Sequence, residues 1–146
     1  MKDDWLEYVP PTVFHSRNEV YEWLAQQVDS EMGIKKEQIV QALLEREETG
    51  DIQIDEWVLL PHIENQLVKA TKVIILPLEQ RIANWNPAIQ QVELILAVFL
   101  APQEKIETKR QIANFMRLLA DEQVIKTLKE GKRLETIDGN ERRNDK

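Results

Sequence analysis

Residues 94–101 read Leu-Ile-Leu-Ala-Val-Phe-Leu-Ala and form the longest apolar run of the chain. A helix that crosses a membrane needs about 20 such residues, so we expect no membrane insertion. A short run of this composition that stops at a proline, here Pro102, is typical of a strand buried in a sheet. The run therefore predicts a buried strand over residues 92–100.

Two further strands are predicted earlier in the chain. Lys72-Val73-Ile74-Ile75-Leu76 is rich in β-branched residues and stops at a proline. The segment between this strand and the one over residues 92–100, including Asn84-Trp85-Asn86-Pro87, is expected to form a loop. The alternating stretch that begins at Ile52 continues into Trp57-Val58-Leu59-Leu60 and stops at another proline, which predicts a strand that enters the sheet. We therefore expect His62 just beyond the end of a strand.

Helices are predicted on both sides of these strands in the sequence. Ser16-Arg17-Asn18-Glu19 has the form of a capping box, and helical spacing of apolar residues extends from there to about residue 32. A second helix is expected to end at Gly50. Two more follow Pro102, and Asp121 caps the last of them. This order of elements predicts an α/β (α+β) fold with helices packed on a mixed sheet.

The composition is that of one folded domain followed by a polar tail. A chain of 146 residues suits a single core, and 42 % hydrophobic with 31 % charged residues is ordinary for a globular protein. We expect one domain over residues 1–137. Residues 138–146, Asp-Gly-Asn-Glu-Arg-Arg-Asn-Asp-Lys, offer nothing apolar to bury and are predicted to be disordered.

The charge and the residue types present exclude several classes of function. A net charge of −7 argues against nucleic acid and anionic membranes as partners, because both require a basic surface. Cysteine is absent, so thiol catalysis is excluded. No glycine-rich phosphate loop or metal-ligand spacing occurs, so no cofactor and no metal are expected. Asp3 and Asp4 stand where an export signal would be basic, and a cytoplasmic location is expected.

Only two histidines occur, His15 and His62. His15 directly precedes a predicted helix cap and needs no functional explanation there. His62 follows a predicted buried strand, and a rigid sheet often presents reactive groups at such positions. A Pro-His pair taken alone is also typical of an ordinary surface loop, and that interpretation is open.

An imidazole that accepts a phosphoryl group needs a cation nearby to stabilise the phosphate oxygens. Arg46 is the candidate, because its guanidinium suits bidentate contact with phosphate and the second helix ends shortly after it. The alternative is that Arg46 belongs to a solvated helix face together with Glu45, Glu47 and Glu48.

Two separated segments together resemble the active-site region of one protein family. They are residues 43–50, Leu-Leu-Glu-Arg-Glu-Glu-Thr-Gly, and residues 59–62, Leu-Leu-Pro-His. Both are similar to the enzyme IIA domains of the fructose/mannitol class, and of the nitrogen-related class, of the bacterial phosphoenolpyruvate-dependent sugar phosphotransferase system. In that family, a leucine-rich helix ends in an Arg-Glu pair, and an aliphatic-Pro-His motif carries the phosphorylated histidine. The resemblance extends from the helix at Ser16 to Gly131.

The resemblance implies a fold and a set of roles. The fold would have three layers, α/β/α, with a mixed sheet flanked by helices on both sides. His62 would accept a phosphoryl group from the histidine-containing phosphocarrier protein and pass it to a cysteine of an enzyme IIB, while Arg46 stabilises the phosphate. Thr108 stands where many members carry a second histidine, and its hydroxyl would donate a hydrogen bond to the phosphate.

Three departures from the family pattern favour an alternative function. Residues 51–58 lack the family's glycines, Ile63 replaces a small residue and is expected to crowd an approaching partner, and Thr108 cannot replace imidazole chemistry. The alternative is a divergent enzyme IIA-like protein that transfers phosphate poorly and acts by binding a regulatory protein. A third possibility is a globular α/β domain whose Pro-His pair is incidental.

Overall fold

The structure, a computed structural model, describes residues 4–66 and 68–134. All four predicted helices are present. In chain order the elements are β1 (Leu6–Tyr8), α1 (Arg17–Met32), α2 (Lys36–Thr49), β2 (Gln53–Asp55), β3 (Val58–Leu59), β4 (His62–Ile63), β5 (Lys72–Asn86), β6 (Ile89–Phe99), α3 (Ile106–Leu118) and α4 (Glu122–Lys129).

The strands form one mixed sheet, as predicted. Its order is β1-β5-β6-β3-β2, and β4 also pairs with β6. β1 is parallel to β5, and both β3 and β4 are parallel to β6. β5 and β6 are antiparallel, as are β2 and β3. β6 contains most of the long apolar run and is the central strand, with β5 on one side and β3 and β4 on the other.

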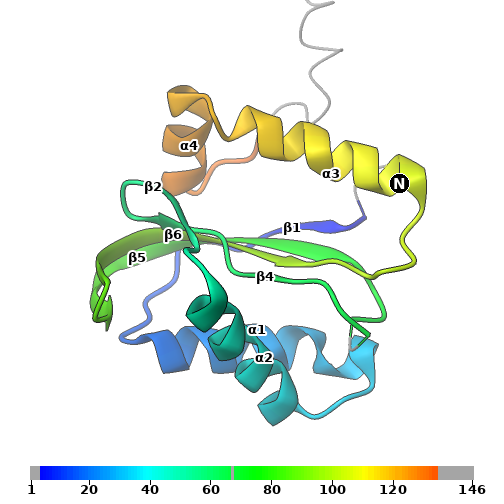
Figure 1. Ribbon diagram of the computed structural model, residues 1–146. Coiled ribbons are helices and arrows are strands. Elements are labelled where there is room, and N and C mark those ends of the chain that lie inside the picture. The colour runs from blue at the N-terminus through cyan, green and yellow to red at the C-terminus, as the bar shows by residue number, and fades with distance from the viewer. Residues whose placement is uncertain (1–3, 67, 135–146) are drawn as a thin grey trace, which may run out of the picture.

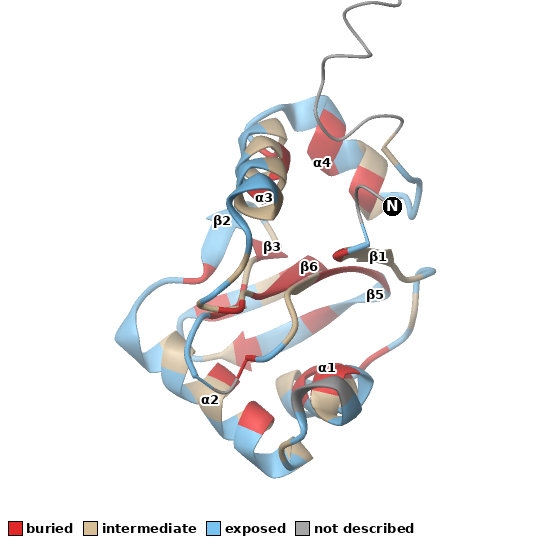
Figure 2. Cartoon of the chain, turned by 90° about the vertical axis from the view of Figure 1, so that its right-hand side faces the viewer, coloured by how far each residue is buried: buried red, intermediate tan, exposed pale blue. Residues whose placement is uncertain are grey.

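The helices cover both faces of the sheet (Figure 1): α1 and α2 lie on one face, and α3 and α4 lie on the other. Side chains alternate along β6, so that Phe99 packs in a core with α1 and α2, while Val98 packs in a second core with α3 and α4. Figure 2 shows the buried positions concentrated in the sheet and on the helix surfaces that face it. The prediction of a three-layer α/β/α fold is confirmed.

The first helix begins where its cap predicted. Ser16 Oγ accepts a hydrogen bond from the backbone N–H of Glu19 at 3.2 Å, and Gly33 ends the helix with φ of 68°. The other half of the predicted capping box is displaced by one residue, because the Glu19 carboxylate accepts from the backbone N–H of His15 at 2.8 Å. This backbone hydrogen bond is the main cause that lowers the pKa of Glu19.

The single strand predicted from Ile52 to Leu60 is wrong. The segment instead forms the hairpin of β2 and β3, and the chain reverses at Trp57, whose φ is 64°. A positive φ is uncommon for a residue other than glycine, so no turn signal marks this position in the sequence. The indole ring contacts a residue distant in the chain, since the Arg81 guanidinium carbon lies 3.7 Å from its centre.

The loop predicted between residues 76 and 92 is also wrong, except at Pro87 and Ala88, which form a turn. β5 continues to Asn86 as part of a long hairpin with β6, in which Ile82 pairs with Val92 and Asn86 pairs with Ile89. Ile82 and Trp85 are buried in the core that faces α1 and α2. Irregular register between Pro77 and Ile82, and again between residues 83 and 86, breaks the strict alternation that would have identified a strand.

Strand β1 was not predicted, because three residues are too few to show a period. Residues 6–8 pair in parallel with Val73, Ile74 and Ile75 of β5. The predicted domain boundary at residue 137 and the predicted disorder of residues 138–146 lie outside the described residues. Within the described ranges, no helix has the length and apolar character needed to span a membrane.

Candidate functional site

His62 lies just beyond the end of β3, as expected, but it is the first residue of β4, so the alternative of an ordinary surface loop is wrong. It pairs in parallel register with Val98 of β6. Pro61 separates β3 from β4 because it has no N–H to donate, while its carbonyl still accepts from the backbone N–H of Val98 at 2.8 Å. The two short strands therefore continue along the same edge of β6, and the sheet holds His62 in a fixed position.

The side chains of His62 and Ile63 point to opposite faces of the sheet. Residues paired across neighbouring strands share a face, so His62 shares the face of Val98 and Ile63 shares that of Phe99. Ile63 is 6 % exposed and belongs to the core beneath α1 and α2, whereas His62 is half-buried. The bulk of Ile63 is thus placed in the core on the face opposite to His62, and the expected crowding of a partner has no support in this geometry.

The environment of His62 keeps its imidazole neutral. Burial is the main cause that lowers the pKa of His62 below its ordinary value, the charge of Glu64 raises it, and the charge of Arg46 lowers it further. A neutral ring has a free nitrogen lone pair and can act as a nucleophile. The predicted role of Arg46, stabilisation of a phosphate, stays a prediction.

Arg46 lies in the last turn of α2, the helix that packs against β4. Its guanidinium donates a hydrogen bond to the carbonyl of Gly50 at 3.3 Å, and the Thr49 hydroxyl donates to the Arg46 carbonyl at 2.9 Å. Within residues 4–66 and 68–134, Arg46 forms no ion pair with a carboxylate. Its positive charge is therefore not paired with a carboxylate of the described residues.

The neighbouring Glu47 is not part of a solvated face, so that interpretation is wrong for this residue. Its side chain is 5 % exposed, and its carboxylate accepts hydrogen bonds from Arg17 at 3.0 Å, Trp85 at 3.0 Å and Asn86 at 2.9 Å. The Tyr21 hydroxyl is a further donor to Glu47. Both carboxylate oxygens are thus used, and the group links three segments of the chain.

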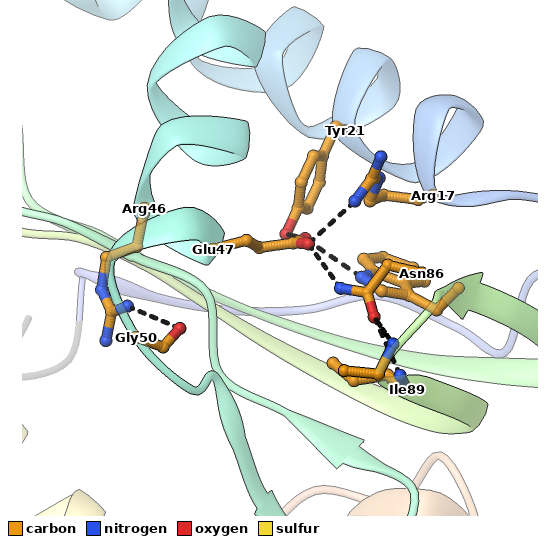
Figure 3. A network of polar contacts seen from close by, with 9 residues as sticks. Arg17, Tyr21, Arg46, Glu47, Gly50, Asn86 and Ile89 are labelled. Carbon is orange, nitrogen blue, oxygen red and sulfur yellow. Dashed lines mark hydrogen bonds and ion pairs between the residues drawn. The ribbon is translucent and has the colours of Figure 1, made fainter.

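Figure 3 shows that the side chains of Arg46 and Glu47 have different surroundings. Glu47 points toward α1 and the end of β5, whereas Arg46 points away from it, toward Gly50. Burial, reinforced by the hydrogen bond to Glu47, raises the pKa of Tyr21, so this phenol stays protonated and keeps donating. The sequence placed Glu47 in the Arg-Glu pair but gave no role for its carboxylate, because its partners are 26 to 39 residues away in the chain and no local pattern predicts them.

Thr108 lies in the first turn of α3, and its side chain forms a hydrogen bond with the Glu104 carboxylate. Hydrogen bonds from the side chains of Thr71, the larger effect, and Thr108 lower the pKa of the Glu104 carboxyl. Thr71 also accepts from the backbone N–H of Ala101 at 3.0 Å. Donation from Thr108 to a phosphate remains a prediction, and it requires the hydroxyl to leave Glu104.

The fold occurs in solved structures of low sequence identity. The nitrogen regulatory protein IIA-Ntr from Neisseria meningitidis is 16% identical and superposes with a TM-score of 0.70, covering 86% of this chain and 88% of that one. IIA mannitol from Escherichia coli is 18% identical, with a TM-score of 0.59 and coverage of 92% and 91%. A complex of enzyme IIAMTL and phosphorylated enzyme IIBMTL from Escherichia coli is 16% identical, with a TM-score of 0.60 and coverage of 93% of this chain and 90% of that one. No curated protein sequence matches the chain.

The sequence itself matches a family model over nearly its whole length. Residues 9–138 match the family described as "Phosphoenolpyruvate-dependent sugar phosphotransferase system, EIIA 2". This match agrees with the α/β/α fold and with the Arg-Glu and Pro-His segments from which the resemblance was first inferred. The chain therefore belongs to the EIIA 2 family of the phosphoenolpyruvate-dependent sugar phosphotransferase system.

Proposed function

We propose that this chain is a phosphocarrier and that His62 is the residue that carries the phosphoryl group. The observation that carries the proposal is the placement of a neutral, half-buried imidazole on a rigid strand beside a helix whose Arg46 is not paired with a carboxylate. Such a pair can supply the nucleophile and a compensating positive charge, the two groups that phosphoryl transfer to nitrogen requires.

In the proposed reaction, a ring nitrogen of His62 attacks the phosphorus of a phosphohistidine on the histidine-containing phosphocarrier protein. The donor's P–N bond breaks as a new P–N bond forms, and the donor recovers its neutral ring. A cysteine thiolate of an enzyme IIB then takes the phosphoryl group, forming a P–S bond and releasing His62. Arg46 stabilises the charge on the phosphoryl oxygens in both steps. These partners imply a cytoplasmic location.

The test is phosphorylation of the purified chain by phosphoenolpyruvate and the general phosphotransferase proteins, measured by intact mass. The wild type should gain one phosphoryl group. His62→Ala should gain none, whereas His15→Ala is the matched control and should behave as wild type, because its exposed ring contacts Glu19 at the helix entrance. A wild type that stays unmodified while a known family member is modified would reject the proposal.

The alternative is a regulatory protein that acts by binding a partner protein. It is favoured by the likeness in fold to a nitrogen regulatory protein and by the engagement of Thr108 with Glu104. Transfer of the phosphoryl group to enzyme IIB distinguishes the carrier from the regulatory protein. A phosphorylated chain that passes its phosphate to enzyme IIB supports the carrier, whereas one that keeps the phosphate and binds a regulator only in one phosphorylation state supports regulation.

A further inference from the structure

The last turn of α2 places two neighbouring side chains in opposite environments. Glu47 is almost fully buried and has donors from α1 and from the end of β5. Arg46, one residue earlier, has only a 3.3 Å hydrogen bond to the carbonyl of Gly50 within the described part of the chain. A long side chain with one weak contact at a helix end does not fix its own position, because helix ends fray and such side chains have many rotamers.

The hydrogen bonds of Glu47 come from well-ordered parts of the fold. Tyr21 is fully buried, Trp85 is 3 % exposed, and their rings pack edge to face with centres 5.4 Å apart. Asn86 is itself held by its Oδ1, which accepts from the backbone N–H of Ala88 and of Ile89, both at 2.8 Å. The carboxylate therefore links the end of α2 to α1 and to the β5–β6 hairpin.

We propose that Glu47 is a positioning residue for phosphoryl transfer: by fixing the last turn of α2, it fixes the place of the Arg46 guanidinium at the end of the helix that packs against β4, the strand of His62. The inference rests on the proposed function, since it assigns Arg46 to the phosphate. Pairing of Glu47 with Arg17 at 3.0 Å also matters, because it satisfies the carboxylate with a different cation.

The protonation of His62 reports the position of Arg46 without any phosphate. The charged groups that act on this imidazole are Arg46, which lowers its pKa, and Glu64, which raises it. If Glu47→Gln releases Arg46, the pKa of His62 should rise. The direct effect of removing a negative charge has the opposite sign, because it disfavours the imidazolium and lowers the pKa. The direction of the shift therefore separates positioning from simple electrostatics.

The experiment is an NMR titration of His62 in wild type, Arg46→Ala, Glu47→Gln and the double variant. Arg46→Ala should raise the pKa of His62, Glu47→Gln should raise it toward the same value, and the double variant should match Arg46→Ala. Glu48→Gln is the matched control, because it makes the same charge change at an exposed position one residue further on. It should leave the pKa unchanged or lower it.

A folded Glu47→Gln protein whose His62 pKa stays at or below the wild-type value would overturn the inference, as would an Arg46→Ala protein without a rise. If Glu47→Gln does not fold, Tyr21→Phe carries the same test, because it removes one donor and keeps the buried ring. A rise in the pKa of His62 supports positioning, and an unchanged pKa overturns it.

Phosphorylation rates provide the second readout. Loss of one charge-stabilising group typically slows such a step by about 100-fold or more, and Arg46→Ala should show a loss of this size. Glu47→Gln should slow transfer by no more than Arg46→Ala and should add no loss in the double variant. If not even the wild type is phosphorylated, the proposed carrier function is rejected. The titration still decides whether Glu47 positions Arg46.

Discussion

At the scale of single residues, the proposed phosphoryl transfer depends on the protonation state of His62. Burial and Arg46 disfavour the imidazolium, and Glu64 partly compensates. A phosphoryl acceptor benefits from this balance, because the nucleophilic form is the neutral ring. The same balance makes the folded protein less tolerant of acid.

The first prediction concerns stability against pH. An unfolded histidine binds a proton near pH 6.5, and the folded His62 does so only at lower pH. Its contribution to stability is therefore fully present above about pH 6.5 and is lost as the pH falls toward the folded pKa. The free energy of unfolding of the wild type should fall relative to that of His62→Gln between neutral and mildly acidic pH. Urea denaturation measures this, and parallel profiles for the two proteins would contradict it.

The sequence identifies some of these residues and not others, for a physical reason. His62 and Arg46 occur in recognisable local motifs, and Arg46 lies in the last turn of α2, the helix that packs against β4. Glu47 sits in a run of acidic residues that suggests exposure to solvent, yet its carboxylate is buried. Its burial depends on donors such as Tyr21 and Trp85, which the fold brings together from distant segments, and local patterns cannot contain that information.

At the scale of elements, capping chemistry is local and was predictable, whereas the long hairpin was not. Ser16 and Asp121 accept the hydrogen bonds expected of helix caps. The extension of β5 through Asn86 depends on pairing with β6 and on burial of Trp85 beneath α1. Asn84, Asn86 and Pro87 are residue types common in turns, so they suggested a longer loop than the turn that Pro87 and Ala88 form between β5 and β6.

The second prediction concerns the cap of α1. Ser16→Ala removes the acceptor for the Glu19 backbone N–H and should lower the free energy of unfolding by about 1 kcal/mol. Ser30→Ala is the control, because Ser30 lies near the other end of the same helix and is exposed; it should change stability by less than about 0.5 kcal/mol. Urea denaturation measures both. Equal losses in the two variants would contradict the assigned cap.

At the scale of the whole molecule, one sheet serves two cores. Successive residues of β6 face opposite layers, so that Phe99 lies under α1 and α2 and Val98 under α3 and α4. Neither layer of helices can lose its packing without exposing the same strand. We therefore expect the described domain to unfold as one cooperative unit.

The third prediction tests this cooperativity. Leu24→Ala in α1 and Phe115→Ala in α3 both truncate fully buried side chains and should cost about 2–5 kcal/mol each. Ile106→Ala is the exposed control, since Ile106 is 62% exposed. Circular dichroism and tryptophan fluorescence should report the same shifted transition in both buried variants. Separate transitions for the two probes would show that the layers unfold independently.

The account as a whole rests on His62 being the residue that carries the phosphoryl group. The most direct measurement is to phosphorylate the chain with phosphoenolpyruvate and the general phosphotransferase proteins and then to map the phosphate by fragmentation mass spectrometry at neutral to basic pH. The predicted result is one phosphoryl group on His62. A phosphate found instead on His15 or on any other residue, or a chain that remains unmodified, would contradict the account.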